Sequence, residues 1–212
     1  MNRKFISKSN RVLRKILNSK DNLDILQDLI ESFLDIKIQE ITLNPYLEIK
    51  SKYLPKEENF GVADVRVTLE NGEELNIGVQ FIDGYYVQQK MLLYYTQIHF
   101  NQLAHDKTRN MARTITINIL DFMYFASKEY HKKWHIECNP DKYSVNEELE
   151  LHVFELPKFK QIDKQNISRK EAWMIYLKGE SNFLIQRVLQ DFPKIKKLDD
   201  LLEMYWKEEK ME

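Results

Sequence analysis

The feature that most constrains the fold is a pair of alternating stretches joined by a short turn. Apolar and polar residues alternate through residues 62–69, and apolar residues again recur at every second position through residues 75–81. Side chains two residues apart project from the same face of a strand, so each stretch has one face suited to a core. Asn71-Gly72 between them favours a tight turn. The pattern predicts a β-hairpin.

A long helical pattern follows this hairpin and leads into further strands. The helix is expected in residues 85–104, and a mostly apolar strand follows in residues 114–122. The other expected elements are helices in residues 8–20 and 22–36, strands around residues 130–136 and 149–156, and two or three helices from residue 168 onward. This order favours a mixed sheet flanked by helices, so the predicted class is α/β with a helical C-terminal tail.

Two residues mark expected helix boundaries. Asp21 is a suitable N-cap for the helix predicted in residues 22–36, because its side chain can accept a hydrogen bond from the first turn. Pro193 fits either the first turn of a helix or a break between two helices. Both boundaries are predicted from how these residue types interact with the helix backbone.

Length and composition indicate one folded domain. The chain has 212 residues, of which 43% are hydrophobic and 31% are charged, as in ordinary globular proteins. We expect a main domain in residues 1–165 and a helical extension in residues 166–212 that packs on the same domain. We see no internal repeat and no glycine-rich phosphate loop.

Charge and cysteine content narrow the class of protein. The net charge of −1 gives no general attraction to nucleic acid or to anionic membranes, so any DNA contact would need a local basic patch. The single cysteine, Cys138, cannot form an internal disulfide, and the first residues lack the apolar run of a secretory signal. No apolar stretch approaches the roughly 20 residues of a membrane-spanning helix. We therefore expect a cytoplasmic protein without a membrane contact.

The hairpin offers positions for a divalent-metal site. Such a site can form when one strand supplies an Asp and its neighbour supplies polar residues at i and i+2, which share one face. The candidates here are Asp64, Gly78 and Gln80. A two-residue turn at Asn71-Gly72 would pair Asp64 with Val79 and separate it from Gln80, whereas a three-residue turn or a bulge would pair Asp64 with Gln80.

These and several other segments resemble one known family. From about residue 8 to residue 185 the sequence is similar to the Rpn family of recombination-promoting nucleases and transposases, which belong to the PD-(D/E)XK nuclease superfamily. The matching segments are Ala63-Asp64-Val65-Arg66-Val67 with Gln80 at the expected interval, the helix Lys90 to Leu103, the strand Ile115 to Phe122, Tyr130-His131, and Glu155-Leu156-Pro157-Lys158-Phe159. The resemblance implies a restriction-endonuclease-like fold and Mg²⁺-dependent DNA cleavage, with Asp64 as a metal ligand and Gln80 in place of the superfamily's lysine.

Two departures from the family pattern concern its acidic residues. The family carries Glu on the second strand of the hairpin, where this sequence has Gly78. The family's first helix commonly shows an acid where this sequence has Arg11. Since Mg²⁺ usually relies on one or two carboxylates together with water and phosphate oxygens, Asp64 alone would hold the ion poorly. Loss of the ion would remove the activation of water and the stabilisation of the leaving oxygen.

Three hypotheses about function follow. The first is a degenerate nuclease-like protein that binds DNA or a partner and has little or no cleavage activity. The second is an active Mg²⁺-dependent DNA endonuclease that promotes recombination, in which another acid replaces the missing one. The third is association with itself or with an active paralogue, which it would restrain.

Basic and histidine residues give further candidate contacts. Arg14 and Lys15 near the N-terminus, together with Lys90, are the expected DNA-binding residues; the basic N-terminal stretch also fits a solvated helix face. His131 and His135 have i, i+4 spacing, which is compatible with zinc, but ordinary surface histidines are the simpler interpretation.

Overall fold

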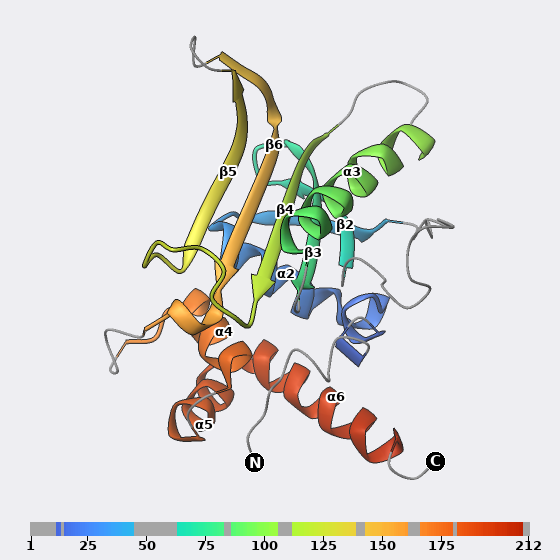
Figure 1. Ribbon diagram of the computed structural model, residues 1–212. Coiled ribbons are helices and arrows are strands. Elements are labelled where there is room, and N and C mark those ends of the chain that lie inside the picture. Colours follow the sequence, from blue (N-terminus) through green and yellow to red (C-terminus); the bar gives the residue numbers. More distant parts are fainter. Residues whose placement is uncertain are drawn as a thin grey trace. The chain divides into compact units, whose positions relative to one another are not determined.

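The computed structural model describes residues 12, 13, 15–44, 63–82, 86–105, 112–138, 143–160, 166–179 and 182–209. Figure 1 shows a mixed sheet together with helices, as the predicted α/β class requires. The described residues divide into two compact units. The sheet unit draws on residues 38–120 and 131–154, and the helical unit draws on residues 1–37, 121–130 and 155–212.

The sheet unit contains six strands in the order β1-β2-β3-β4-β6-β5. The strands are β1 (Ile38–Leu43), β2 (Ala63–Leu69), β3 (Glu74–Ile82), β4 (Arg113–Leu120), β5 (His131–Cys138) and β6 (Tyr143–Glu155). Strands β1, β2 and β3 pair antiparallel, whereas β3 and β4 pair parallel, so the sheet is mixed as predicted. Strand β1 had no predicted counterpart.

Helix α3 (Val87–His105) makes the crossover between the parallel strands β3 and β4. A parallel pair requires a long connection, and a helix that packs back on the sheet supplies it. Figure 1 shows α3 lying along β3 and β4. Gln102 holds the end of α3, because its Nε2 donates to Thr114 Oγ1 at 2.8 Å and its Oε1 accepts from Ala112 N at 2.9 Å. The predicted hairpin, helix and following strand are thus confirmed.

The two faces of β3 and β4 differ in chemistry. One face carries Ile77, Val79, Ile115 and Ile117, all of which are buried. The residues that alternate with them on β3 and β4 are Asn76, Gly78, Gln80, Thr114, Thr116 and Asn118, and helix α3 covers this face. A buried polar face needs hydrogen-bond partners, so α3 must supply more than apolar contact.

The helical unit is built around α2 (Leu23–Leu34), whose buried residues recur every three or four positions. The later elements of this unit are η2 (Leu156–Lys158), α4 (Arg169–Lys178), α5 (Asn182–Asp191) and α6 (Pro193–Glu209). Ser168 and Glu171 form a capping box that starts α4, and α6 begins at Pro193, as predicted for a first helical turn. Helices α4 and α6 both pack against α2. The boundary between residues 165 and 166 stays a prediction.

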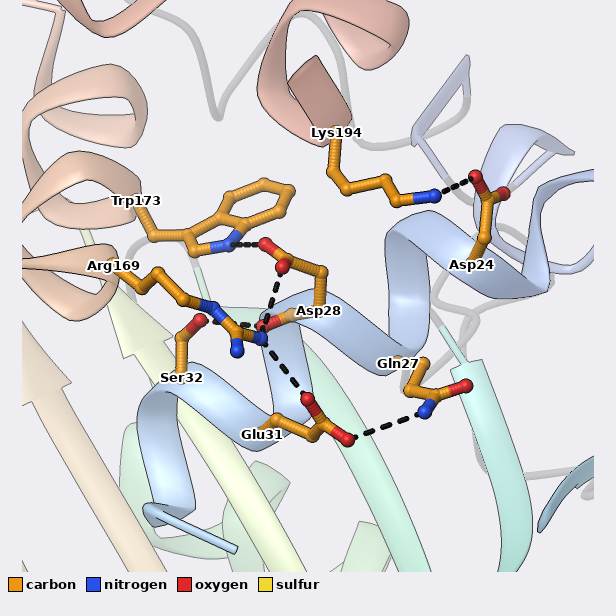
Figure 2. A network of polar contacts seen from close by, with 8 residues as sticks. All are labelled: Asp24, Gln27, Asp28, Glu31, Ser32, Arg169, Trp173 and Lys194. Atoms are coloured by element: carbon orange, nitrogen blue, oxygen red, sulfur yellow. Dashed lines mark hydrogen bonds and ion pairs between the residues drawn. The ribbon is translucent and has the colours of Figure 1, made fainter. Parts of the chain in front are cut away.

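Figure 2 shows how polar contacts fasten α2 to the C-terminal helices. The guanidinium of Arg169 lies 2.9 Å from Asp28 Oδ1 and 3.0 Å from Glu31 Oε2. The indole N–H of the fully buried Trp173 donates to Asp28 Oδ2 at 2.8 Å. Burial raises the pKa of Asp24, but hydrogen bonds and charges from Lys194 and Lys197 outweigh it and hold that pKa below its usual value.

The predicted N-cap of α2 is wrong. Asp21 lies inside a short 3₁₀ turn, η1 (Lys20–Asn22), and its backbone N–H donates to Ser19 Oγ at 3.3 Å. Asn22 immediately precedes α2, and its Nδ2 donates to Ile16 O at 3.2 Å. Ser19, two residues before Asp21, therefore caps the 3₁₀ turn, and α2 starts at Leu23, one residue later than an N-cap at Asp21 predicts. None of the described helices is long and apolar enough to cross a membrane.

Candidate functional site

The turn between β2 and β3 fixes which residues meet across the hairpin. Gly72 N donates to Leu69 O at 2.9 Å, and Leu69 N donates to Glu73 O at 2.9 Å, which leaves a three-residue loop starting at Glu70. Gly72 has φ of +83°, a conformation that glycine adopts without a steric penalty. This register pairs Asp64 with Gly78.

Neither predicted pairing of Asp64 is observed, because the loop begins one residue earlier than either assumption. Asp64 lies opposite Gly78 instead of Val79 or Gln80. Directly opposed residues share a face of the sheet, and so do residues two positions apart on one strand. Asp64, Gly78 and Gln80 therefore lie on one face, as the family pattern requires, and this is the face that α3 covers.

Helix α3 approaches the sheet closely at Gly78. A Cβ atom placed on Gly78 would lie 2.0 Å from Ile98 Cδ1, 2.9 Å from Tyr94 Cε1 and 3.0 Å from Tyr94 OH. Ile98 and Tyr94 are 1% and 5% exposed, and Tyr94 OH donates to Ala63 O at 2.6 Å. Because the tyrosine is anchored and the isoleucine is enclosed, neither can move aside freely. The two side chains occupy the space that a glutamate at this position would need.

Asp64 is a half-buried acceptor beside two amides. Asn44 Nδ2 donates to Asp64 Oδ1 at 2.8 Å and also to Asn76 Oδ1, and Asn44 N donates to Asp64 O at 3.0 Å. Asn76 Nδ2 donates to Ile98 O on α3 at 3.3 Å. Sequence reasoning missed Asn44 and Asn76, since neither belongs to a recognisable motif. The two asparagines can be recognised only after the strands are paired, because pairing places them next to Asp64.

Gln80 is 2% exposed and lies beside Asn118 on the neighbouring strand. Its Oε1 has no hydrogen-bond partner in the described part of the chain, and the same holds for Asn118 Oδ1. An unpaired buried acceptor typically costs about 1–3 kcal/mol. Asn118 Nδ2, in contrast, donates to His152 O and Thr116 Oγ1, each at 3.1 Å. Asn118 is thus fixed in orientation.

The residues beside Asp64 do not fit Mg²⁺. The ion needs near-octahedral oxygen coordination with one or two carboxylates. Gly78 supplies no side-chain oxygen, and the amide of Asn44 directs an N–H donor at Asp64. Among the described residues no group of three His, Cys, Asp or Glu side chains could hold a metal ion.

The predicted DNA-binding residues fall in different parts of the chain. Lys90 lies in the first turn of α3 and is half-buried, with its backbone N donating to Tyr86 O at 2.8 Å. Lys15 belongs to the helical unit and is exposed, with Nζ 4.7 Å from the centre of the Tyr205 ring. Arg11 and Arg14 lie outside the described residues. A role of these residues in DNA binding stays a prediction.

A second polar group, unexpected from the sequence, joins β5 and β6. His131 Nε2 lies 2.9 Å from His152 Nδ1, and His152 Nε2 contacts Glu150 Oε1, which also lies 2.9 Å from Lys133 Nζ. Burial raises the pKa of Glu150, but these hydrogen bonds and charges outweigh it and lower the pKa to about 2. His131 is therefore part of an interstrand network, in contrast to the surface interpretation; the side chain of His135 lies outside the described residues.

The segment Glu155 to Phe159, the most distinctive part of the resemblance, has a structural role in the helical unit. Glu155 Oε1 accepts from Tyr124 N at 2.5 Å and from Phe125 N at 3.1 Å. Lys158 Nζ donates to Glu155 Oε2 at 2.6 Å and to Phe125 O at 2.5 Å. Both side chains are buried, and each neutralises the charge of the other. Through their bonds to the backbone, the two residues fix the turn at residues 124–125.

Comparisons with known proteins agree with the α/β fold described above. The sequence model described as PD-(D/E)XK nuclease family transposase matches residues 10–212. No curated protein and no solved structure matches the chain. The match spans nearly the whole sequence, and the α/β fold with a six-stranded mixed sheet is consistent with a restriction-endonuclease-like fold. The chain belongs to the PD-(D/E)XK nuclease family transposases.

Proposed function

We propose that this protein is a degenerate member of its family, which binds DNA or a protein partner and has little or no phosphodiesterase activity. The observation that carries the proposal is the packing at Gly78, where Ile98 and Tyr94 fill the volume a metal-binding glutamate would need. The missing acid is thus accompanied by close packing of α3 against its place on β3. A simple loss of one side chain would leave that volume open.

The chemistry of the family reaction explains why this packing matters. A bound Mg²⁺ ion would activate water and stabilise the charge on the leaving oxygen. Asp64 retains a carboxylate, but a second carboxylate at position 78 is replaced by a hydrogen atom. An ion held by one carboxylate alone must complete its coordination with water and substrate oxygens, and its affinity falls accordingly. The protein would keep the scaffold without the catalytic ion.

The same scaffold supports binding roles. DNA contact would involve Arg14, Lys15 and Lys90, and its affinity would fall steeply with salt because lysine and arginine displace counterions from phosphate. Association with itself or with an active paralogue is an alternative form of binding, in which this chain restrains its partner. In either case we propose action in the cytoplasm, on the basis of the single cysteine.

One observation favours a second candidate, an active Mg²⁺-dependent endonuclease that promotes recombination. Asp64 and Gln80 lie on one face, and Gln80 Oε1 has no partner among the described residues, so this oxygen is able to accept a hydrogen bond from water. In that case Asp64 would bind the metal, Gln80 would position water and another acid would complete the site. The packing at Gly78 argues for the degenerate form.

The test is nicking of supercoiled plasmid in Mg²⁺ or Mn²⁺ by the wild type, by Asp64→Ala and by Glu70→Ala. Glu70 is an exposed acid of the hairpin turn and controls for loss of a negative charge. We expect the wild type to cleave no faster than Asp64→Ala. Metal-dependent cleavage that disappears in Asp64→Ala but persists in Glu70→Ala would establish the active endonuclease instead.

A further inference from the structure

Asn44 holds an unusual position in the sheet unit. It directly follows β1, and its backbone N–H donates to Asp64 O at 3.0 Å, which fixes the residue beside β2. Its side chain then turns over the sheet, where Nδ2 donates both to Asp64 Oδ1 at 2.8 Å and to Asn76 Oδ1. One nitrogen therefore serves two oxygens that come from two different strands.

The orientation of these amides follows from their other contacts. Asn76 Nδ2 donates to Ile98 O at 3.3 Å, so its Oδ1 is directed away from α3 and toward Asn44. The Asp64 carboxylate and the Asn76 amide oxygen both accept hydrogen bonds, and of the two ends of the Asn44 amide the Nδ2 end is the donor. Rotating the Asn44 amide by 180° would bring Oδ1 against two other oxygens. The observed orientation is therefore the one that satisfies all three groups.

We propose that Asn44 takes the place of the family's cation: its side-chain NH₂ satisfies Asp64 and Asn76, and the site assembles without any metal. This inference rests on the proposed loss of nuclease activity and gives it a physical cause. A primary amide presents two hydrogens to two acceptors, as the positive charge of an ion would face the same oxygens. Asp64 is then retained as an acceptor that links β1, β2 and β3.

The substitution Asn44→Asp tests directly whether the Asn44 NH₂ group takes the place of a cation. This substitution replaces the NH₂ donor with a second carboxylate and places three oxygens where the structure has two oxygens and a donor. Without metal, the like charges of residues 44 and 64 repel, and the variant should be less stable than the wild type. A divalent cation should bind between the oxygens and reverse the loss, because a ligand that binds only the folded state stabilises it.

The experiment is thermal unfolding, without DNA, in EDTA and in millimolar Mn²⁺. We expect Asn44→Asp to unfold at least about 5 °C below the wild type in EDTA and to recover most of this in Mn²⁺. The wild type should shift by less than about 1 °C. Asn71→Asp is the matched control, because it adds the same charge in the exposed turn and keeps the acceptor that Glu73 N uses. It should show no response to Mn²⁺.

Two results would overturn the proposal. The first is a Mn²⁺-dependent rise in the wild type that is absent in Asp64→Asn, since the cation would then displace Asn44. The second is an Asn44→Asp variant that gains no stability or refolding yield from Mn²⁺. Because no nucleic acid is present, the result is separate from plasmid nicking: cleavage through a metal bound elsewhere would sink the proposed function and leave the role of Asn44 intact.

Discussion

Gly78 illustrates how one residue combines a lost ligand with a gained contact. Its hydrogen side chain permits Ile98 and Tyr94 to rest on β3, while Gly72 serves backbone geometry alone, with φ of +83° and open space around it. Glycine is therefore required for a different physical reason at each position. A substitution at either position should destabilise the fold, but by a different mechanism. At position 78 the obstacle is steric and lies on another element, so a change in that element can relieve it.

The residue-scale prediction is that Gly78→Ala destabilises the protein through overpacking, by about 1–3 kcal/mol. Ile98→Val removes the Cδ1 atom that lies 2.0 Å from the added methyl group. Alone it should cost about 0.5–1.5 kcal/mol. In the Gly78→Ala background it should cost clearly less or restore stability. Urea unfolding of the four proteins in this double-mutant cycle measures the coupling.

Gly72→Ala is the control for the coupling at Gly78. It should also destabilise the protein, because an alanine at positive φ is strained, but Ile98→Val should not relieve the loss. Additive effects of Gly78→Ala and Ile98→Val would contradict both the steric account of Gly78 and the close packing of α3 against this position.

At the scale of single elements, β5 and β6 depend on a charged network as well as on backbone pairing. Lys133 and His152 surround the carboxylate of Glu150, whose pKa is lowered to about 2 from a usual value of 4.5. A carboxyl group with a lowered folded-state pKa stabilises the fold above its unfolded pKa. That stability is lost as the pH falls from about 4.5 toward about 2.

The element-scale prediction concerns Glu150→Gln, which keeps an acceptor but removes the charge. Near neutral pH the variant should be less stable than the wild type, and the difference should shrink as the pH falls through the window between the two pKa values. Urea unfolding from pH 7 to pH 2.5 measures this difference, with Glu70→Gln as an exposed control. A difference that stays constant with pH would show that the charge of Glu150 does not stabilise the pair.

Strand β1 shows what period-two patterns miss. Ile38 pairs with Leu69 and Ile41 pairs with Val67, so two isoleucines three positions apart lie on one face. A shift in register between Ile38 and Glu40 makes this possible, because a bulge adds one residue to one strand only. The alternation that predicted β2 and β3 is broken at that point. Asn44 belongs to no motif, and its place beside Asp64 depends on where β1 ends and how β1 pairs with β2.

At the scale of the whole molecule, local patterns predicted the order of elements better than their contacts. The crossover through α3, the parallel strand β4 and the helices after residue 168 all follow from periodicity or from prolines and caps. The contact of Lys194 with Asp24 joins residues 170 positions apart, and no local pattern selects this pair among the 32 basic and 33 acidic residues. Long-range partners follow only from the packing of complete helices.

The whole-molecule prediction is that residues 166–212 are an integral part of the fold. Helices α4 and α6 pack against α2, and Arg169 and Trp173 bond to Asp28 on it. A chain ending at residue 165 would uncover the part of α2 that α4 and α6 contact, on a helix whose apolar residues Leu26, Leu29 and Phe33 are all buried. We expect this chain to lose more helix by circular dichroism than the missing segments contain, and to bind a hydrophobic dye such as ANS.

Adding the missing segment back tests whether residues 166–212 are an integral part of the fold or whether truncation merely damages the protein. Residues 166–212 supplied as a separate polypeptide should restore the helix signal and suppress dye binding, because the same apolar and polar contacts can form without a covalent link. Arg169→Ala in the added polypeptide should weaken the restoration, since the contacts to Asp28 and Glu31 are lost. Lys196→Ala should not, because its partner Asp200 lies on the same helix. Full stability of residues 1–165 alone would instead make the C-terminal helices an independent addition to a self-sufficient domain.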